Sequence, residues 1–96
     1  MGSPEHFQLY SNFPNPFNAG TTIHYSLHKA ADVLVQVYSP TGKWISTLFQ
    51  GHQNAGKKNI FWDGTDERGR EVSSGIYLCR IGAGSEHRSM KMLLVR

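Results

Sequence analysis

The chain has 96 residues, of which 39% are hydrophobic and 18% charged, and this length suits a single domain. Its single cysteine excludes a disulfide scaffold and a zinc site built from several thiolates. The formal net charge is +3 and the basic residues are dispersed, which argues against a nucleic-acid-binding surface. No segment approaches the ~20 apolar residues of a membrane span, so we expect no membrane insertion.

The periodicity of the sequence predicts strands and no helix. The first three residues, Met1-Gly2-Ser3, are typical of an expression scar, and we expect residues 4–96 to form one domain. Apolar and polar residues alternate with a period of two, the pattern of half-buried β-strands. A short edge strand is expected at 7–9, followed by strands near 22–28, 33–38, 44–49, 58–62, 76–81 and 89–95.

Turn-forming residues separate these strands at nearly regular intervals. Pro, Gly, Asp and Asn cluster in segments 39–42, 51–56, 63–69 and 82–85. About seven short strands in a chain of this length predict an all-β fold, an immunoglobulin-like antiparallel β-sandwich. The alternation predicts a structural core that contains Ile23, Tyr25, Val35, Val37, Trp62 and Tyr77.

Tyr77 precedes Cys79 by two residues, which is the spacing of an immunoglobulin-type tyrosine corner. In that motif the ring is buried and the hydroxyl group bonds back to the main chain. Cys79 has no second cysteine to pair with, so we expect a reduced thiol that packs as a small hydrophobic side chain.

Several short motifs occur in an order that is specific in combination. They are Asn15-Pro16-Phe17-Asn18, Thr21-Thr22-Ile23-His24-Tyr25-Ser26-Leu27, Trp62-Asp63-Gly64, Ser74-Gly75-Ile76-Tyr77 and Lys91-Met92-Leu93-Leu94. This order resembles the C-terminal sorting domains of type IX secretion cargo. Those domains are similar to the immunoglobulin-like module of the flagellar hook-capping protein. Ala19, Cys79 and Ser85 depart from the pattern without removing a motif.

The resemblance implies a non-catalytic module at the carboxyl end of a larger exported precursor. An upstream signal peptide would bring the precursor to the periplasm, and this domain would address it to the outer-membrane secretion machinery and the cell surface. The implied partners are that machinery and an upstream catalytic or adhesive domain, and no cofactor is implied. The chain stops within a predicted strand at Arg96, as we expect of a natural C-terminus.

The resemblance also directs attention to two segments as sorting or recognition elements. In the first, prolines stiffen the chain and Phe17 is expected to insert between the sheets. In the second, the terminal strand, we expect Met92 and Leu94 in the core and a recognition role for the basic residues, with strand addition as the mode of contact. The candidate recognition residues are Asn15, Pro16, Phe17, Gly75, Tyr77, Lys91 and Arg96.

Two other functions remain open. One is an accessory carbohydrate-binding or adhesive module of a secreted hydrolase, which requires exposed aromatic side chains. Trp44, Phe49 and Phe61 are the aromatic residues that we expect to face outward. The other is a structural module of the hook-capping type.

Metal binding and catalysis have weaker support. Asp63, Asp66 and Glu67 lack the spacing of a calcium loop, and a hydrogen-bonded turn is the favoured interpretation, although any calcium would bind there. His24 and His28 would lie ~13 Å apart along a strand, too far for one metal ion. The remaining histidines at 6, 52 and 87 form no metal motif. A mid-strand Cys79 lacks the open, electropositive setting of a nucleophile, so we expect no enzyme.

Overall fold

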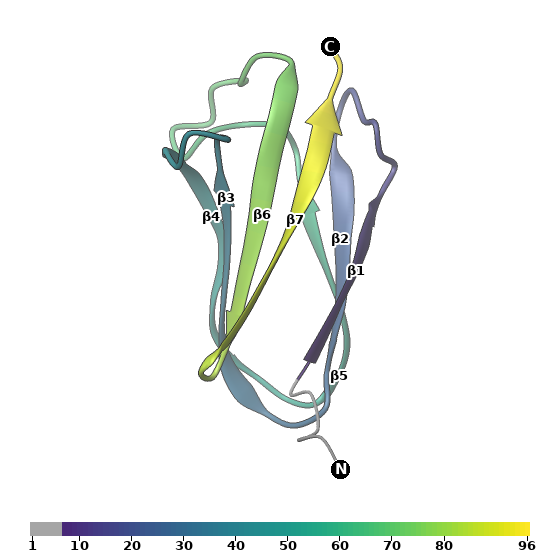
Figure 1. The fold of residues 1–96 in the computed structure, drawn as a ribbon, viewed down its shortest axis with the longest axis vertical. Coiled ribbons are helices and arrows are strands. Elements are labelled where there is room, and N and C mark those ends of the chain that lie inside the picture. Colours follow the sequence, from purple (N-terminus) through teal and green to yellow (C-terminus); the bar gives the residue numbers. More distant parts are fainter. Residues whose placement is uncertain (1–6) are drawn as a thin grey trace.

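A computed structural model describes residues 7–96, so the expression scar predicted at residues 1–3 and the histidine at position 6 lie outside the described residues. The described chain contains seven strands and no helix, which confirms the predicted immunoglobulin-like β-sandwich (Figure 1). The strands are β1 (Phe7–Phe13), β2 (Thr21–Leu27), β3 (Ala31–Tyr38), β4 (Trp44–Gln53), β5 (Gly56–Trp62), β6 (Gly75–Ala83) and β7 (Glu86–Leu94).

The strands form two antiparallel sheets that pack face to face (Figure 1). One sheet has the order β1-β2-β5, and the other has the order β4-β3-β6-β7. The edge strands β1 and β7 therefore lie beside each other on one flank of the elongated sandwich, whose extents are 43 × 23 × 23 Å. No helix with the length and hydropathy of a membrane span occurs in the described part of the chain.

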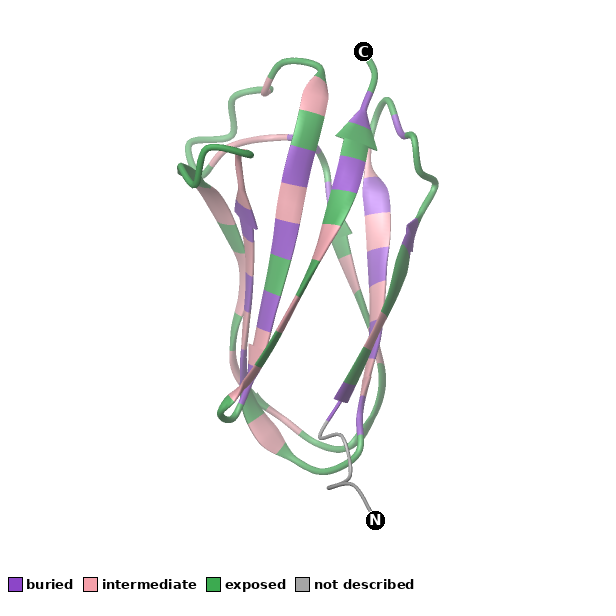
Figure 2. Cartoon of the chain, viewed as in Figure 1, coloured by how far each residue is buried: buried purple, intermediate pink, exposed green. Residues whose placement is uncertain are grey.

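The core follows from the alternation of side chains along each strand. In β2 every second residue, from Thr21 to Leu27, is buried, and the intervening side chains face outward. Figure 2 shows the same banding along β3 and β6. Because the two apolar faces meet, each core side chain leaves water almost completely. Exposed fractions are 7% or less for Ile23, Tyr25, Val35, Val37, Trp62 and Tyr77.

Several strands are longer than the sequence pattern predicts. β1 continues to Phe13, and β4 continues through Gly51 to Gln53, so the loop predicted at 51–56 shrinks to residues 54–55. The reason is tertiary, because Gln53 and Gly51 pair with Ala31 and Val33 of β3 despite the low strand propensity of glycine. In the last hairpin β6 extends to Ala83 and β7 begins at Glu86, so the turn predicted at 82–85 shrinks to residues 84–85.

A bulge in β4 turns the side chain of one aromatic residue that was expected to face outward. The register of β4 against β3 shifts between Val35 and Gln36, which places Phe49 opposite the inward-facing Val35. Phe49 therefore packs against the core, and the expectation that it faces outward was wrong. A register shift in β1 between Leu9 and Asn12 accompanies the exposure of Tyr10 and Phe13, which the sequence pattern did not single out.

Cys79 is buried in the middle of β6 as a free thiol. Burial raises the pKa of this thiol to about 12, because desolvation disfavours the thiolate.

We expect Cys79 to resist thiol reagents at pH 8–9 in the native chain and to react readily after denaturation, since only the thiolate is nucleophilic. Labelling with a chromogenic disulfide with and without denaturant measures this difference. Rapid modification of the folded chain would contradict the buried placement. Because the folded pKa lies above the unfolded one, stability is retained below about pH 9 and declines as the pH rises towards 12.

Candidate functional site

The two segments singled out for recognition lie against each other. Residues 14–20, here called the crossing segment, lead from β1 past the end of β7 to β2. The Phe17 amide donates to the carbonyl of Leu93 at 2.9 Å, and the Val95 amide donates to the carbonyl of Phe17 at 2.8 Å. The Leu93 amide donates to Oδ1 of Asn15 at 3.0 Å. Through Phe17 the crossing segment therefore forms a single parallel bridge to Leu94 at the end of β7.

The ring of Phe17 is part of an aromatic row inside the sandwich. It is 2% exposed and meets the Trp62 ring edge to face at a centroid distance of 5.6 Å. Trp62 makes a similar contact with Tyr77 at 5.3 Å. The Tyr77 hydroxyl donates to the carbonyl of Ser73 at 2.6 Å, which is the bond expected of a tyrosine corner. Phe17 and Tyr77 are thus packing residues with little surface to offer a partner.

Gly75 acts through its backbone. It begins β6 opposite Leu94 and has a φ of +153°, a conformation that favours glycine, although a Cβ atom there would meet nothing within 4 Å. Its freedom lets the chain turn from the 63–74 loop into β6 beside the terminal strand.

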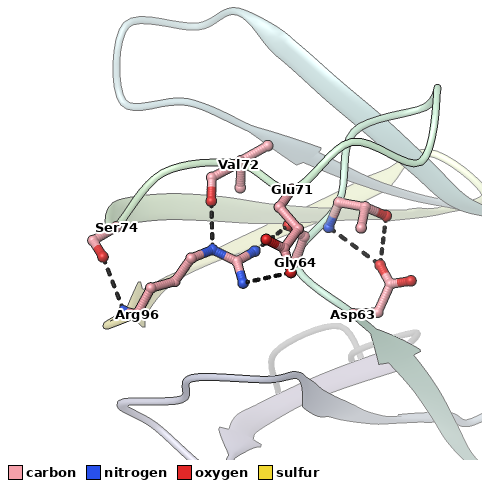
Figure 3. Close-up of polar contacts among 7 residues, drawn as sticks. Asp63, Gly64, Glu71, Val72, Ser74 and Arg96 are labelled. Atoms are coloured by element: carbon pink, nitrogen blue, oxygen red, sulfur yellow. Dashed lines mark hydrogen bonds and ion pairs between the residues drawn. The ribbon is translucent and has the colours of Figure 1, made fainter.

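Arg96 holds the end of β7 to the 63–74 loop (Figure 3). Its Nε donates to the carbonyl of Val72 at 2.6 Å, and its Nη2 donates to the carbonyl of Gly64 at 2.7 Å. Its backbone amide donates to Oγ of Ser74 at 2.9 Å, and Nη1 lies 3.4 Å from Oε2 of Glu71. A residue predicted to meet the secretion machinery is therefore engaged within its own domain.

We expect Arg96→Ala to lower the free energy of unfolding by about 1–2 kcal/mol, since it removes charge-assisted hydrogen bonds to two carbonyls on a partly exposed surface. Arg96→Lys should recover only part of the loss, because an ammonium group lacks the planar fork. Chemical denaturation measures both variants, with Arg68→Ala, an exposed position in the same loop, as the control. An equal effect of Arg68→Ala and Arg96→Ala would contradict the assignment.

Lys91 and Pro16 differ from the other candidates, because their side chains are exposed and no side-chain bond is seen for either within the described residues. Lys91 lies opposite Leu78 on the outer face of the four-stranded sheet. Pro16 lines a shallow hollow with Pro14, Phe17, Asn18 and Val95. Asn15 is also exposed, but its side-chain oxygen is used by the amide of Leu93.

The acidic loop after β5 is organised by hydrogen bonds within the chain. Asp63 accepts from the amide and hydroxyl of Thr65 at 3.2 and 2.6 Å. Asp66 accepts from the amides of Arg68 and Arg70 and from the Arg70 guanidinium. The backbone N–H of Arg70, the largest cause, lowers the pKa of Asp66 below its usual value. The described residues contain no group of three or more His, Cys, Asp or Glu side chains placed to hold a metal ion.

The exposed aromatic rings do not form one stacking surface with Trp44. Trp44 is 40% exposed on β4, whereas Phe61 is 61% exposed on β5 of the other sheet. Phe13, which is 74% exposed, lies in the same row of the three-stranded sheet as Phe61, because both residues pair with Thr22 of β2.

A groove between the edges of β1 and β7 was not predicted from the sequence. It has a volume of about 250 Å³ and includes Asn12, Ser89 and Lys91 in its lining. Asn12 is 3% exposed, and its Nδ2 donates to Oγ1 of Thr21 at 3.0 Å. Its Oδ1 is buried and has no hydrogen-bond partner within residues 7–96. An unsatisfied buried acceptor typically costs about 1–3 kcal/mol, so this atom needs an explanation.

Solved structures with the same fold include domains of much larger proteins. The dimeric latent PorU from Porphyromonas gingivalis aligns at 23% identity with a TM-score of 0.76, covering 97% of this chain and 10% of PorU. PorZ of the same organism, a surface component of the type IX secretion system, aligns at 22% identity with a TM-score of 0.60, covering 92% of this chain and 11% of PorZ. At these identities the likeness shows the fold alone.

A domain of the Pseudomonas fluorescens alkylpurine DNA glycosylase AlkC also aligns, at 14% identity with a TM-score of 0.52, covering 95% of this chain and 31% of that protein. Comparison with curated protein sequences gives no match. A family model described as the FlgD Ig-like domain matches residues 15–86, from the Asn15-Pro16-Phe17 motif to the start of β7. The match covers more than half of the chain, and the chain therefore belongs to the FlgD Ig-like domain family.

Proposed function

We propose that this chain is a non-catalytic C-terminal sorting domain, which directs an exported precursor through the type IX secretion system to the cell surface. The observation that carries the proposal is the joining of the crossing segment to the terminal strand by the bonds between Phe17 and residues 93 and 95. These bonds hold residues 93–95 in a defined conformation that a partner could recognise. The fold shared with domains of PorU and PorZ supports a link to that system.

Within this proposal the candidate residues have two kinds of role. Lys91 and Pro16 present side chains to the outer-membrane secretion machinery, since both are exposed. Asn15, Phe17, Gly75, Tyr77 and Arg96 act indirectly by fixing the position of β7. The upstream domain of the precursor, catalytic or adhesive, supplies the activity that the cell exports.

The test is a fusion of this domain to a reporter with an export signal, expressed in a host that has type IX machinery. We expect the reporter at the cell surface, and less of it there for Lys91→Glu. Lys57→Glu is the matched control, because Lys57 is an exposed lysine on β5 of the opposite sheet. Deletion of residues 91–96 would be less informative, since it also removes the buried Met92 and Leu94.

Retention of the folded, unmodified fusion in the periplasm would show that the sorting proposal is wrong. Equal export of the Lys91→Glu and Lys57→Glu fusions would exclude a contact between Lys91 and the secretion machinery. It would not contradict the sorting role of the domain.

The match to the FlgD Ig-like domain family favours a second candidate, a structural module of the hook-capping type. In that case the fusion would stay in the periplasm, and the parent gene would lie among flagellar genes and encode a short protein. A long precursor with a signal peptide would argue against it.

A further inference from the structure

The strands β1 and β7 are neighbouring edges of the two sheets (Figure 1). The groove lies between them. It begins below the junction with the crossing segment and runs along Asn12, Ser89 and Lys91. A second hollow, lined by Gln8, Leu9, Tyr10 and Arg88, continues it along β1. The groove is therefore elongated and parallel to the strands, which suits a chain in extended conformation.

The end of β7 already pairs at one position with the crossing segment. The amide and carbonyl of Leu93 and the amide of Val95 point away from β6 to the crossing segment. β6 and β7 pair without a register shift, so backbone direction alternates regularly along β7. His87, Ser89 and Lys91 consequently direct their N–H and C=O groups to the same side as Leu93. The His87 carbonyl already accepts a hydrogen bond from Nη1 of Arg88 at 3.0 Å, so Ser89 and Lys91 are the positions whose outward main-chain groups the peptide would use.

Asn12 provides an independent indication of a ligand. Its buried Oδ1 lacks a donor within residues 7–96, and the residue lines the same groove. The orientation of the amide is fixed, because its Nδ2 faces the carbonyl of Pro14 and the hydroxyl of Thr21, which itself donates to Pro14. The oxygen is therefore an unpaired acceptor in the wall of the groove, and because less than 1 Å² of it is exposed, a peptide N–H satisfies it only when that wall shifts to admit the donor.

The charge of the groove indicates the kind of peptide. Its lining includes Lys91 and Arg88 and no acidic side chain. Arg88 is already engaged by Glu86 and by the ring of Phe7, at 3.7 and 5.4 Å respectively. Lys91 has no ion pair with any residue in the described range, so it is the cation available to a carboxylate.

We propose that this groove binds an extended peptide segment with an acidic side chain, which adds to the edge of β7 at residues 87–91. Main-chain hydrogen bonds to Ser89 and Lys91 give the affinity, and the contact of Lys91 with the carboxylate gives the charge preference. An N–H group of the peptide satisfies Asn12. This site is a property of the domain alone and does not depend on the proposed sorting role.

The test uses the isotope-labelled 96-residue chain and a synthetic peptide of alternating valine and threonine with a central aspartate. We expect saturable NMR shifts and slower hydrogen exchange at the amides of Ser89 and Lys91, and a shift of the Asn12 side-chain amide. Ser89→Pro should weaken binding about tenfold or more, because it removes an outward N–H while leaving the bonds to β6. Ser89→Ala, which keeps that N–H, should bind like the original chain.

Three further arms make the outcome decisive. A lysine in place of the central aspartate should weaken binding to the original chain and strengthen it to Lys91→Glu. Methylation of the peptide amides that face β7 should abolish binding without any change in the protein. The proposal is overturned if the aspartate peptide shifts none of these amides, or if Ser89→Pro binds as well as Ser89→Ala. It is also overturned if raising the concentration of the chain alone slows hydrogen exchange at the amides of Ser89 and Lys91. That result would identify a second copy of the chain as the occupant.

Discussion

Replacement of Trp62 by alanine is expected to lower the free energy of unfolding by about 3–5 kcal/mol. The indole is 1% exposed and contacts the rings of both Phe17 and Tyr77. Its Nε1 also donates to the carbonyl of Thr65 at 2.9 Å, so the substitution leaves a cavity and an unpaired carbonyl. Small domains are stable by only about 5–15 kcal/mol, so the variant loses much of its stability. Urea denaturation followed by circular dichroism measures the change.

Phe61→Ala is the matched control for Trp62→Ala. Phe61 is the preceding residue of β5, but its side chain faces outward and is 61% exposed. We expect a loss below about 1 kcal/mol there. Similar losses at the two positions would contradict the register that places Trp62 inside and Phe61 outside.

The elements whose side chains alternate regularly are those that the sequence predicts well. β2 and β3 keep strict alternation, so Ile23, Tyr25, Val35 and Val37 were assignable to the interior without a structure. β4 does not alternate, because two register shifts against β3 insert extra residues. The local sequence pattern does not predict such a bulge. For this reason the side chain of Phe49 was wrongly predicted to face outward.

The sequence predicted which residues belong to the candidate site, but it did not predict which of them contact one another. The motif around Asn15 and the end of the chain drew attention separately, yet they pair with each other across most of the sequence. A long-range pairing of this kind depends on the topology of the two sheets, which periodicity does not specify. The same limit applies to Arg96, whose partners at Gly64 and Val72 lie on a distant loop, and to Asn12, whose unpaired oxygen exists only because of the packing around it.

Phe17→Ala is expected to lower the free energy of unfolding by about 3–5 kcal/mol, since it empties a position that is 2% exposed. Part of this loss comes from the ring contact with Trp62. A double-mutant cycle between Phe17 and Trp62 should therefore give a coupling free energy of about 0.5–1.5 kcal/mol. Thermal or chemical unfolding of the single and double variants provides these values. Phe13→Ala, at a position 74% exposed, should be nearly neutral.

The same variants separate two roles for the Asn15-Pro16-Phe17 motif in export. If the motif acts by holding β7 in place, the Phe17→Ala fusion should lose export in proportion to its folded fraction, and a stabilising change elsewhere in the core should restore it. Loss of export from a Phe17→Ala chain with unchanged stability would instead mean that the machinery contacts the phenylalanine directly. That result would require the crossing segment to leave β7 during recognition, because the ring is inaccessible while the amide of Phe17 is bonded to Leu93.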